Sequence, residues 1–589
     1  MRPSVEISVL NRGNNLQTPW LRGSVVLSYA LLLGGLLTVF AATYMVVVSY
    51  SNLPASDGWE QIDVVLRGVS PLSPAWLWSQ HNEHRLVIPK LFLAADLLWF
   101  RGNQKLLLGS ILAAQFLLLM LLAWTMRALG GWDGTAWRSG VGIAAFCLFW
   151  PTQWENFIIG FQICFVLPGL LATLSFVELM LYWKRSGRPH SELYLLLSIM
   201  TALAATYSLA NGNLLWPILV AAALLLRLPR SAVLGYIVTG AVSTALYFYH
   251  YSRPPQHASP VASIHTPLRI LEYIAAYFGT PFIRHDLRLA MLTGAIGLAG
   301  AVYVFFRGRF YLHDGEPFPI LLVLILIFCL GTAFITSLGR LNFGIVQAFA
   351  SRYHTIALLF WCCLGLLWLM AESQYAYKRS RFLIAQICML AVIAWSSHLT
   401  RTEIRGARLR AFNFHVAAIA LFTGAYDEVQ FEKAAITNPR AIPDESRFMQ
   451  KNSLSAYSDD AYKQLGKPLD AMYHIAAADE CAGALESTVS VRSFGTPPVF
   501  RIRGWAWDRK HHRPPNAVVA TTDGIITGLG AVGEWRPTAR EAEPRVSNNY
   551  VGYAGYVRRL QPGAAVKLYA ILRGQPQMAC YFASAELAQ

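Results

Sequence analysis

The chain has 589 residues, of which 55% are hydrophobic and only 14% are charged. Soluble globular proteins carry about 25% charged residues, so this composition excludes an ordinary soluble domain and indicates a membrane protein. The formal net charge of +16 does not indicate nucleic-acid binding. The basic residues fall at the ends of apolar runs, and they form no stripe interleaved with aromatic residues.

The first apolar run, 24–49, follows a polar segment, 1–23, that we predict to be cytoplasmic. The run is too long for a signal-peptide core, and no small-residue cleavage site follows it, so it is predicted to be a retained span. Apolar runs near the length that crosses about 30 Å of hydrocarbon then recur as far as 397. The sequence predicts a transmembrane domain, 24–397, of eleven spans: 24–49, 106–126, 139–152, 161–182, 193–208, 214–226, 232–250, 289–306, 318–337, 353–371 and 382–397.

Basic residues predict the orientation of these spans. With the N-terminus inside, every inner segment holds at least two arginines or lysines, whereas the outer turns at 151–160 and 209–213 hold none. This pattern fits the positive-inside rule. If the apolar segment 86–100 crossed the membrane, every later loop would lie on the opposite side and the basic loops would fall outside. The segment is therefore predicted to be an interfacial or re-entrant helix. An odd number of spans then places the C-terminus in the periplasm of a bacterial inner-membrane protein.

The C-terminal region consists of two segments that differ in composition and predicted secondary structure. Residues 398–488 are polar and are predicted to form a periplasmic helical linker. Short β-rich runs separated by Gly, Pro and Asp turns follow, and they predict a small β-sandwich over 489–589. Cys481 and Cys580 are the only cysteines outside the apolar runs, which predicts a disulfide in an oxidising compartment. Their spacing matches no metal-binding signature.

The first outer loop, 50–85, concentrates ionisable residues. Such groups are costly near a bilayer and mark functional sites by default. Asp57 lies just beyond the first span, where a carboxylate could accept a proton from an attacking sugar hydroxyl. The alternative is that Asp57 is a solvated loop acid, and the same alternative applies more strongly to Glu60 and Asp63.

The loop ends in the run Ser79–Arg85, which contains His81, Glu83 and His84. His and Glu are metal-ligand types, but their spacing is not a recognised ligand pattern, so no metal is predicted. A phosphate site fits better, because the Arg85 guanidinium can form forked hydrogen bonds to phosphate oxygens.

Two further outer segments hold polar residues at span ends. Glu155 and Gln162 lie at the outer ends of two spans, where they are candidates for substrate binding or for interhelical hydrogen bonds. Arg340 and Arg352 flank another outer loop. They could hold an anionic lipid head group, or they could be structural arginines that extend toward the interface.

This layout resembles the C-type (GT-C) integral-membrane glycosyltransferases. Asp57 stands where these enzymes carry an acidic residue early in a large outer loop, and the run His81–Arg85 stands where they carry a short polar motif. The run lacks the proline pair of the best-known members. More narrowly, the chain is similar to bacterial membrane proteins of O-antigen and polysaccharide gene sets. The stretches that carry this similarity are Glu83–Arg85, Trp154–Asn156, Gly160–Gln162, Ser351–Tyr353, and Gly504–Ala506 with Asp508.

The resemblance implies a transferase that moves a sugar from a polyprenyl-phosphate carrier to a glycan or lipid-linked acceptor, with inversion and without a cofactor. It assigns catalysis to the carboxylates of Asp57 and Glu83. It assigns substrate binding to His81, His84, Arg85, Glu155, Gln162, Arg340 and Arg352.

Two other functions stay open at this point. An O-antigen polymerase or ligase would also use outer-loop arginines on a lipid-linked donor. A lipid or sugar translocator is the non-enzymatic alternative, but it should show inverted repeats and polar residues at the membrane midplane. The sequence shows neither, and its acids and arginines concentrate in the outer loops.

Overall fold

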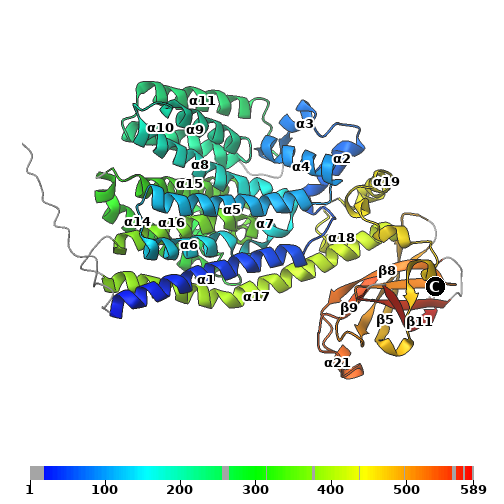
Figure 1. Ribbon diagram of the computed structural model, residues 1–589. Coiled ribbons are helices and arrows are strands. Elements are labelled where there is room, and N and C mark those ends of the chain that lie inside the picture. The colour runs from blue at the N-terminus through cyan, green and yellow to red at the C-terminus, as the bar shows by residue number, and fades with distance from the viewer. Residues whose placement is uncertain are drawn as a thin grey trace, which may run out of the picture.

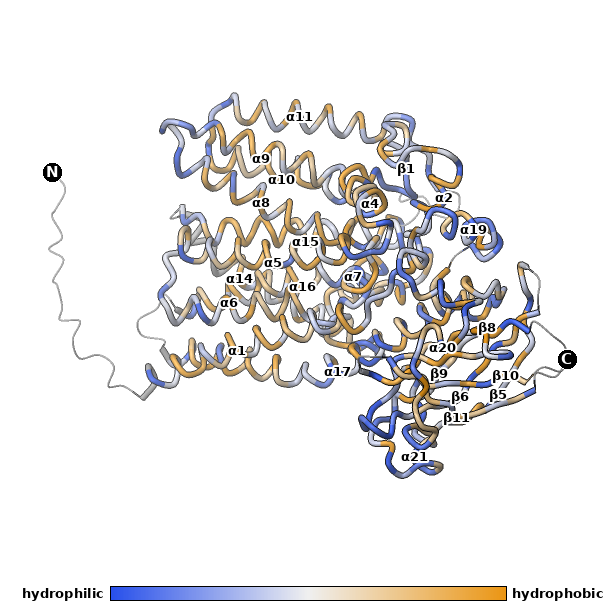
Figure 2. The backbone as a smooth tube through the Cα atoms, turned by 45° about the vertical axis from the view of Figure 1, so that its right-hand side comes forward, coloured by the Kyte–Doolittle hydropathy of each residue, from blue (hydrophilic) through white to orange (hydrophobic). Residues whose placement is uncertain are grey.

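The computed structural model describes residues 19–254, 264–313, 315–373, 379–436, 438–495, 498–559, 565–574 and 577–586. A layered bundle of long helices makes up most of the molecule, and a β-sheet region formed by the last part of the chain lies against one end of it (Figure 1). The first outer loop gathers at that same end, which we call the β end. Apolar residues dominate the helices, whereas polar residues collect at the helix ends and over the β region (Figure 2).

Each of the eleven predicted spans coincides with a helix. The helices are α1 (Pro19–Val48), α5 (Lys105–Ala128), α6 (Gly134–Phe149), α8 (Ile163–Arg185), α9 (Ser191–Thr206), α10 (Leu215–Leu225), α11 (Arg230–Phe248), α14 (Leu287–His313), α15 (Pro317–Arg340), α16 (His354–Ser373) and α17 (Arg379–Thr423). Within the described ranges, eight helices are long and apolar enough to cross a membrane, while α6, α9 and α10 are shorter. The chain is a mainly helical, polytopic membrane protein with a C-terminal β region.

Glycines allow α1 and α6 to approach closely. A Cβ atom added at Gly35 would lie 2.4 Å from the Gly142 carbonyl oxygen, and one added at Gly142 would lie 2.4 Å from the Leu31 carbonyl oxygen. Small residues at such contacts let helix backbones pack together inside membranes, where the hydrophobic effect does not drive helix association.

Short elements of the first outer loop cover the β end of the bundle. They are η2 (Ser56–Trp59), α2 (Glu60–Leu66), α3 (Pro74–Trp78) and a hairpin of β1 (Gln80–His81) and β2 (His84–Arg85). The segment predicted to be interfacial forms α4 (Val87–Phe100), whose 14 residues fall short of the roughly 20 that span a bilayer. The Asp96 carboxylate of this helix accepts hydrogen bonds from the backbone N–H groups of Gln104 and Leu106, at 3.1 and 3.3 Å, and so holds the start of α5. The interfacial position of α4 stays a prediction.

Helix α17 differs from the predicted end of the last span. It runs without a break for 45 residues, so the predicted boundary at 397 falls inside it. At 1.5 Å per residue it is about 68 Å long, roughly twice the hydrocarbon thickness. The residues after 397 are more polar, but they do not interrupt the helix.

The β region also differs from its prediction. Its long strands begin at Cys481 rather than at 489, and two short strands, β3 and β4, precede them. Among the described residues, nine strands pair in one sheet in the order β3-β5-β6-β9-β8-β7-β10-β11-β4 instead of forming a sandwich of two sheets. Alternating apolar residues cannot distinguish the two arrangements, because both bury every second side chain. The strands are β3 (Ala425–Tyr426), β4 (His474–Ile475), β5 (Cys481–Ser493), β6 (Val499–Asp508), β7 (Ala517–Thr522), β8 (Ile525–Glu534), β9 (Gly552–Arg558), β10 (Ala565–Leu572) and β11 (Met578–Glu586).

Hydrogen bonds hold the β region on the end of α17. The Arg558 guanidinium donates to the carbonyl oxygens of Phe422 and Thr423, at 2.6 and 2.9 Å, where the last turn of the helix leaves carbonyl groups unpaired. Just beyond the helix, the Asp427 carboxylate accepts hydrogen bonds from Arg501 and from the Tyr556 hydroxyl, both at 2.8 Å. The sheet is therefore attached to the bundle by directional contacts.

The predicted pairing of Cys481 with Cys580 is confirmed: the two residues form a disulfide between β5 and β11. The bond closes a loop with a sequence separation of 99 residues, and it joins two strands that are far apart in the hydrogen-bonded order. The sheet therefore curls back on itself.

We expect the double substitution Cys481→Ser and Cys580→Ser to destabilise the β region. Closing a loop of about a hundred residues contributes up to roughly 4–5 kcal/mol in the chain-entropy model. Thermal unfolding of the purified protein in detergent, followed by β-sheet circular dichroism, measures the change. The double substitution Cys362→Ser and Cys363→Ser, at thiols buried in α16, is the control. Equal melting of the Cys481/Cys580 variant and the wild type would contradict this expectation.

The membrane orientation gives a second prediction. The basic loops lie on the inner side only if the β end faces outward. An alkaline phosphatase fused after Gln589 should therefore be active in intact bacterial cells, and a cytoplasm-active reporter at the same position should be inactive. The opposite pair of results would reverse the orientation.

Candidate active site

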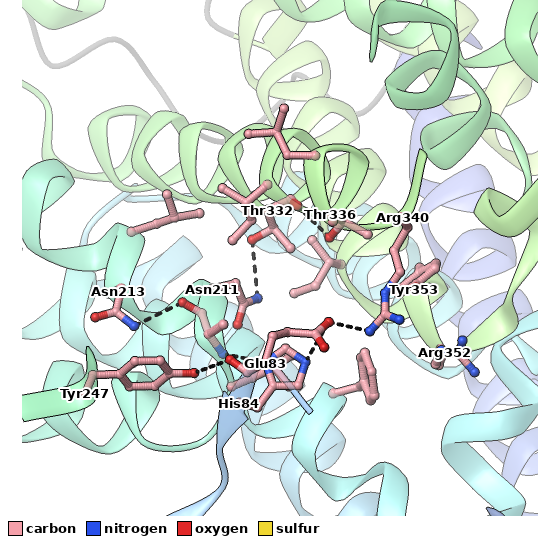
Figure 3. Close-up of a pocket in the computed structure, with 18 of the residues that line it drawn as sticks. Glu83, His84, Asn211, Asn213, Tyr247, Thr332, Thr336, Arg340, Arg352 and Tyr353 are labelled. Carbon is pink, nitrogen blue, oxygen red and sulfur yellow. Dashed lines mark hydrogen bonds and ion pairs between the residues drawn. The ribbon is translucent and has the colours of Figure 1, made fainter. Parts of the chain in front are cut away.

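A cavity of about 430 Å³ opens at the β end of the bundle. Its walls come from α8, α11, α15, α16, α13 (Pro267–Gly279) and η5 (Ala210–Leu214), with the tip of the β1–β2 hairpin at one side (Figure 3). Side chains such as Phe165, Leu214 and Ile356 make much of the lining apolar, while Glu83, Arg340 and others add polar groups. Apolar walls with a few convergent polar groups are typical of ligand-binding sites of this size.

The hairpin tip carries Glu83 to the cavity. His81 and His84 pair across the two strands, so Asn82 and Glu83 form the turn. Asn82 has a φ of 48°, a left-handed conformation that asparagine adopts more readily than most residues. In Figure 3 the Glu83 carboxylate points to the end of α15, where it forms an ion pair with the Arg340 guanidinium. The His84 ring lies beside the same carboxylate, with 3.5 Å between Nε2 and Oε1.

Arg352 supplies a second positive charge from η8 (Ser351–Tyr353) and lines the same cavity. Glu155, in α7 (Trp154–Ile158), fixes this segment. The Glu155 carboxylate accepts a hydrogen bond from the Arg352 backbone N–H at 3.0 Å and lies 3.9 Å from its guanidinium. The neighbouring Asn156 amide donates to the Arg352 carbonyl oxygen at 3.0 Å. Glu155 therefore positions Arg352 and does not itself line the cavity.

A second polar cluster surrounds His81, in the outer loop beside the cavity. His81 forms an ion pair with Glu60 through Nδ1, and its Nε2 lies 3.5 Å from the Asp57 carboxylate. The His81 side chain is 12% exposed, whereas that of Asp57 is 48% exposed. The sequence predicted Asp57 and His81 as site residues, and the structure brings them together outside the cavity lining, with Glu60 as their common neighbour.

Electrostatics within this cluster favours charged groups. The hydrogen bond from His81 lowers the pKa of Asp57, and the charges of Arg352 and Arg340 lower it further. Burial alone would lower the pKa of His81, but its hydrogen bonds to Asp57 and Glu60 outweigh burial and raise it to about 9. His81 is therefore a cation at neutral pH, and Asp57 is a stabilised anion and a weakened base.

Arg85 does not take the predicted phosphate-binding position. It is buried, and its guanidinium donates to the backbone carbonyl oxygens of Tyr247 and Trp78, both at 2.6 Å, and of Tyr249. These bonds tie the hairpin to the end of α11 and direct the donors away from the cavity. The sequence shows that an arginine is present in the motif, but only the fold shows which acceptors it reaches.

Gln162 lies at the end of η4 (Gly160–Gln162), which contacts η2 near Asp57. Its side chain is buried, and its Oε1 atom has no hydrogen-bond partner among the described residues. It lies outside the residues that line the cavity.

Sequence reasoning missed several polar residues of the cavity. Asn211 and Asn213 come from η5, Tyr247 from α11 and Thr332 from α15. The Asn211 amide donates to the Thr332 hydroxyl at 3.3 Å, and the Tyr247 hydroxyl donates to the Glu83 carbonyl oxygen at 3.2 Å. The run Asn211-Gly212-Asn213 in an otherwise apolar outer turn was the available signal. Within the described ranges, no group of three or more His, Cys, Asp or Glu side chains is arranged to hold a metal ion.

No protein-family model and no curated protein matches the chain. Among solved structures, it is similar to the oligosaccharyltransferase of Archaeoglobus fulgidus, crystallised with zinc and sulfate, at 13% sequence identity and a TM-score of 0.38. The alignment covers 68% of this chain and 57% of the oligosaccharyltransferase, so the chain matches little more than half of that protein's length.

The raised pKa of His81 predicts a pH dependence of stability. A histidine whose folded pKa, about 9, exceeds its unfolded value of 6.5 contributes stability that is fully present below pH 6.5 and is lost as the pH rises through about 9. His81→Gln should therefore lower the melting temperature at pH 6. The variant's melting temperature should also fall less than that of the wild type as the pH rises through about 9. Thermal unfolding in detergent from pH 6 to 10 tests this, with the exposed His512→Gln as control. Parallel pH profiles for His81→Gln and the wild type would show that the cluster contributes no such stability.

Proposed function

We propose that the chain is a membrane glycosyltransferase that moves a sugar from a polyprenyl-phosphate carrier to a glycan or lipid-linked acceptor at the periplasmic side of the inner membrane. One observation carries the proposal: Arg340, Arg352 and the Glu83 carboxylate converge on an apolar-walled cavity at the end of the helical bundle. A lipid-linked phosphosugar has the matching parts, namely an apolar chain, an anionic phosphate and a polar sugar.

The arginines are the proposed phosphate-binding groups. Arg340 and Arg352 come from separate helices and both line the cavity, so a phosphate between them could receive hydrogen bonds from both guanidinium groups. The same two charges would stabilise the negative charge that develops on the phosphate as it leaves the sugar. Because Glu155 holds the backbone of Arg352, it contributes to this role indirectly.

Glu83 is the best-supported catalytic base. In the proposed reaction the acceptor oxygen bonds to the anomeric carbon as the bond from that carbon to the phosphate oxygen breaks. Polyprenyl phosphate leaves, and the acceptor proton passes to a carboxylate. Glu83 lines the cavity, whereas Asp57 lies outside the lining. Asp57 therefore fits an electrostatic role in the loop better than the role of the base.

Substitution of Glu83 tests the assignment. Glu83→Gln keeps the size of the side chain but removes its basicity, so we expect sugar transfer to fall by about a hundred- to ten-thousand-fold. Asp57→Asn should reduce transfer less. The matched control is Asp63→Asn, in the same loop, where the carboxylate forms an exposed ion pair with Arg67 at 2.6 Å. Transfer is measured as glycan or lipopolysaccharide profiles of a deletion strain that expresses each variant at equal levels.

The arginine variants separate donor binding from chemistry. Arg340→Ala and Arg352→Ala should weaken binding of a polyprenyl-phosphate sugar, whereas the exposed Arg67→Ala should not. If Asp57→Asn abolishes transfer while Glu83→Gln retains it, the base is Asp57 and the transferase assignment stands. If every variant leaves the glycan profile unchanged, the transferase assignment fails and a translocator is favoured.

A further inference from the structure

Helices α1 and α17 lie side by side along one edge of the bundle (Figure 1). Near their starts, the Ser24 hydroxyl donates to the Gln386 side chain at 2.9 Å, and toward the β end the Arg408 guanidinium donates to the Tyr44 hydroxyl. The two helices are therefore parallel, and the stretch of α17 that precedes Arg408 runs beside the last turns of α1. The described lining of the transfer cavity includes no residue of either helix.

The last turns of α1 present an exposed apolar surface. Phe40 and Val47 are each 69% exposed, and the Phe40 ring stacks on the ring of Tyr44 with 6.3 Å between their centroids. Exposed apolar side chains of a membrane helix contact lipid chains, which are as apolar as they are. Tyrosine is enriched where the hydrocarbon meets the head groups. This surface of α1 therefore extends from the hydrocarbon to the head-group level near Tyr44.

Three arginines of α17 lie beside that surface. Arg401, Arg405 and Arg408 are separated by four and three residues, so their side chains share one face of the helix. Arg401 and Arg405 are exposed, and neither makes a hydrogen bond or an ion pair with a residue in the described ranges. The Arg408 guanidinium lies over the Tyr44 ring, 5.4 Å from its centroid. Like charges at these spacings repel each other, so this face favours an anion from outside the chain.

The length of α17 places these arginines at the head groups of the leaflet on the β-end side. At 1.5 Å per residue, Arg401 and Arg405 lie about 33 and 39 Å from the start of the helix at Arg379. The hydrocarbon layer is about 30 Å thick, and a bilayer with its head groups is about 40–45 Å thick. Arginine side chains near the hydrocarbon boundary extend toward the head groups. The charges of this face therefore lie within reach of lipid phosphates.

We propose that the seam between α1 and α17 binds an anionic phospholipid of this leaflet. Its phosphate accepts forked hydrogen bonds from Arg401 and Arg405. Its acyl chains lie on the exposed side chains of Leu37 and Phe40. A net negative charge relieves the repulsion among the arginines, whereas the ammonium group of a zwitterionic lipid offsets its phosphate. The apolar surface beside the charges favours a lipid over a soluble anion.

Site-specific crosslinking tests the proposal. The full chain, purified in detergent, receives phosphatidylglycerol or phosphatidylethanolamine with a photoreactive acyl chain, and the labelled peptides are identified by mass spectrometry. We expect phosphatidylglycerol to label the α1 peptide with Leu37 and Phe40 in preference to phosphatidylethanolamine. Arg401→Gln and Arg405→Gln should each weaken this labelling by about fivefold, the contribution of one arginine near an anionic lipid surface. Arg401→Lys should weaken it less, because lysine keeps the charge but not the forked geometry.

A matched variant controls for net charge. The double substitution Arg492→Gln and Arg573→Gln removes two exposed arginines of the β region, and it should label as the wild type does. Labelling should also persist in excess inorganic phosphate, because the acyl chains contribute to binding.

Three outcomes would overturn the proposal: equal labelling of α1 by the two lipids, displacement by inorganic phosphate, or unchanged labelling in a chain with both Arg401→Gln and Arg405→Gln. The comparison of the two lipids uses the wild-type chain, so it holds even if a variant does not fold. No sugar is transferred in these measurements, so the transferase proposal and the lipid site stand or fall separately.

Discussion

The pairing of charges at the end of an apolar helical bundle controls the architecture of the β end. An unpaired charge beside hydrocarbon is costly, so each arginine there needs a carboxylate or a set of carbonyl oxygens. Arg340, at the end of α15, is held by Glu83 from the first outer loop, and Arg352, before α16, is held by Glu155 from the loop before α8. These contacts join segments that are distant in sequence, and the cavity lies between them.

The same constraint separates arginines that hold the fold from arginines that line the cavity. Arg85 and Arg340 both lie near Glu83, but Arg85 directs its guanidinium to three backbone carbonyl oxygens and is buried. It fixes the hairpin against α11 and so determines where Glu83 points. Arg340 lines the cavity instead. An arginine whose donors are all used by backbone carbonyl oxygens positions the site. An arginine on the cavity wall can contact a ligand.

Helix α17 links the bundle to the β region. It leaves the apolar layer without a break, packs against Trp154 through Arg410, and carries the sheet on its last turn through Arg558. The disulfide between Cys481 and Cys580 closes the sheet on itself. The β region is therefore a braced extension of the bundle.

Much of the fold follows from the sequence by itself. Runs of apolar residues determined the eleven helices, because hydrocarbon tolerates only a backbone that satisfies its own hydrogen bonds. The two polar-region cysteines determined the disulfide, since no other thiol lies outside the apolar runs. The motif residues Glu83, Glu155, Arg340 and Arg352 were also found from sequence, because ionisable groups stand out at span ends.

Only the tertiary structure decided what those residues do. It paired Glu83 with Arg340 and removed Arg85 from the cavity, because hydrogen-bond partners depend on which distant segments meet. It extended α17 past the predicted boundary, since a helix continues wherever its backbone bonds persist, whatever its side chains. It also made one curled sheet in place of a sandwich. Local patterns determine which face of a strand is buried, but long-range pairing determines what buries it.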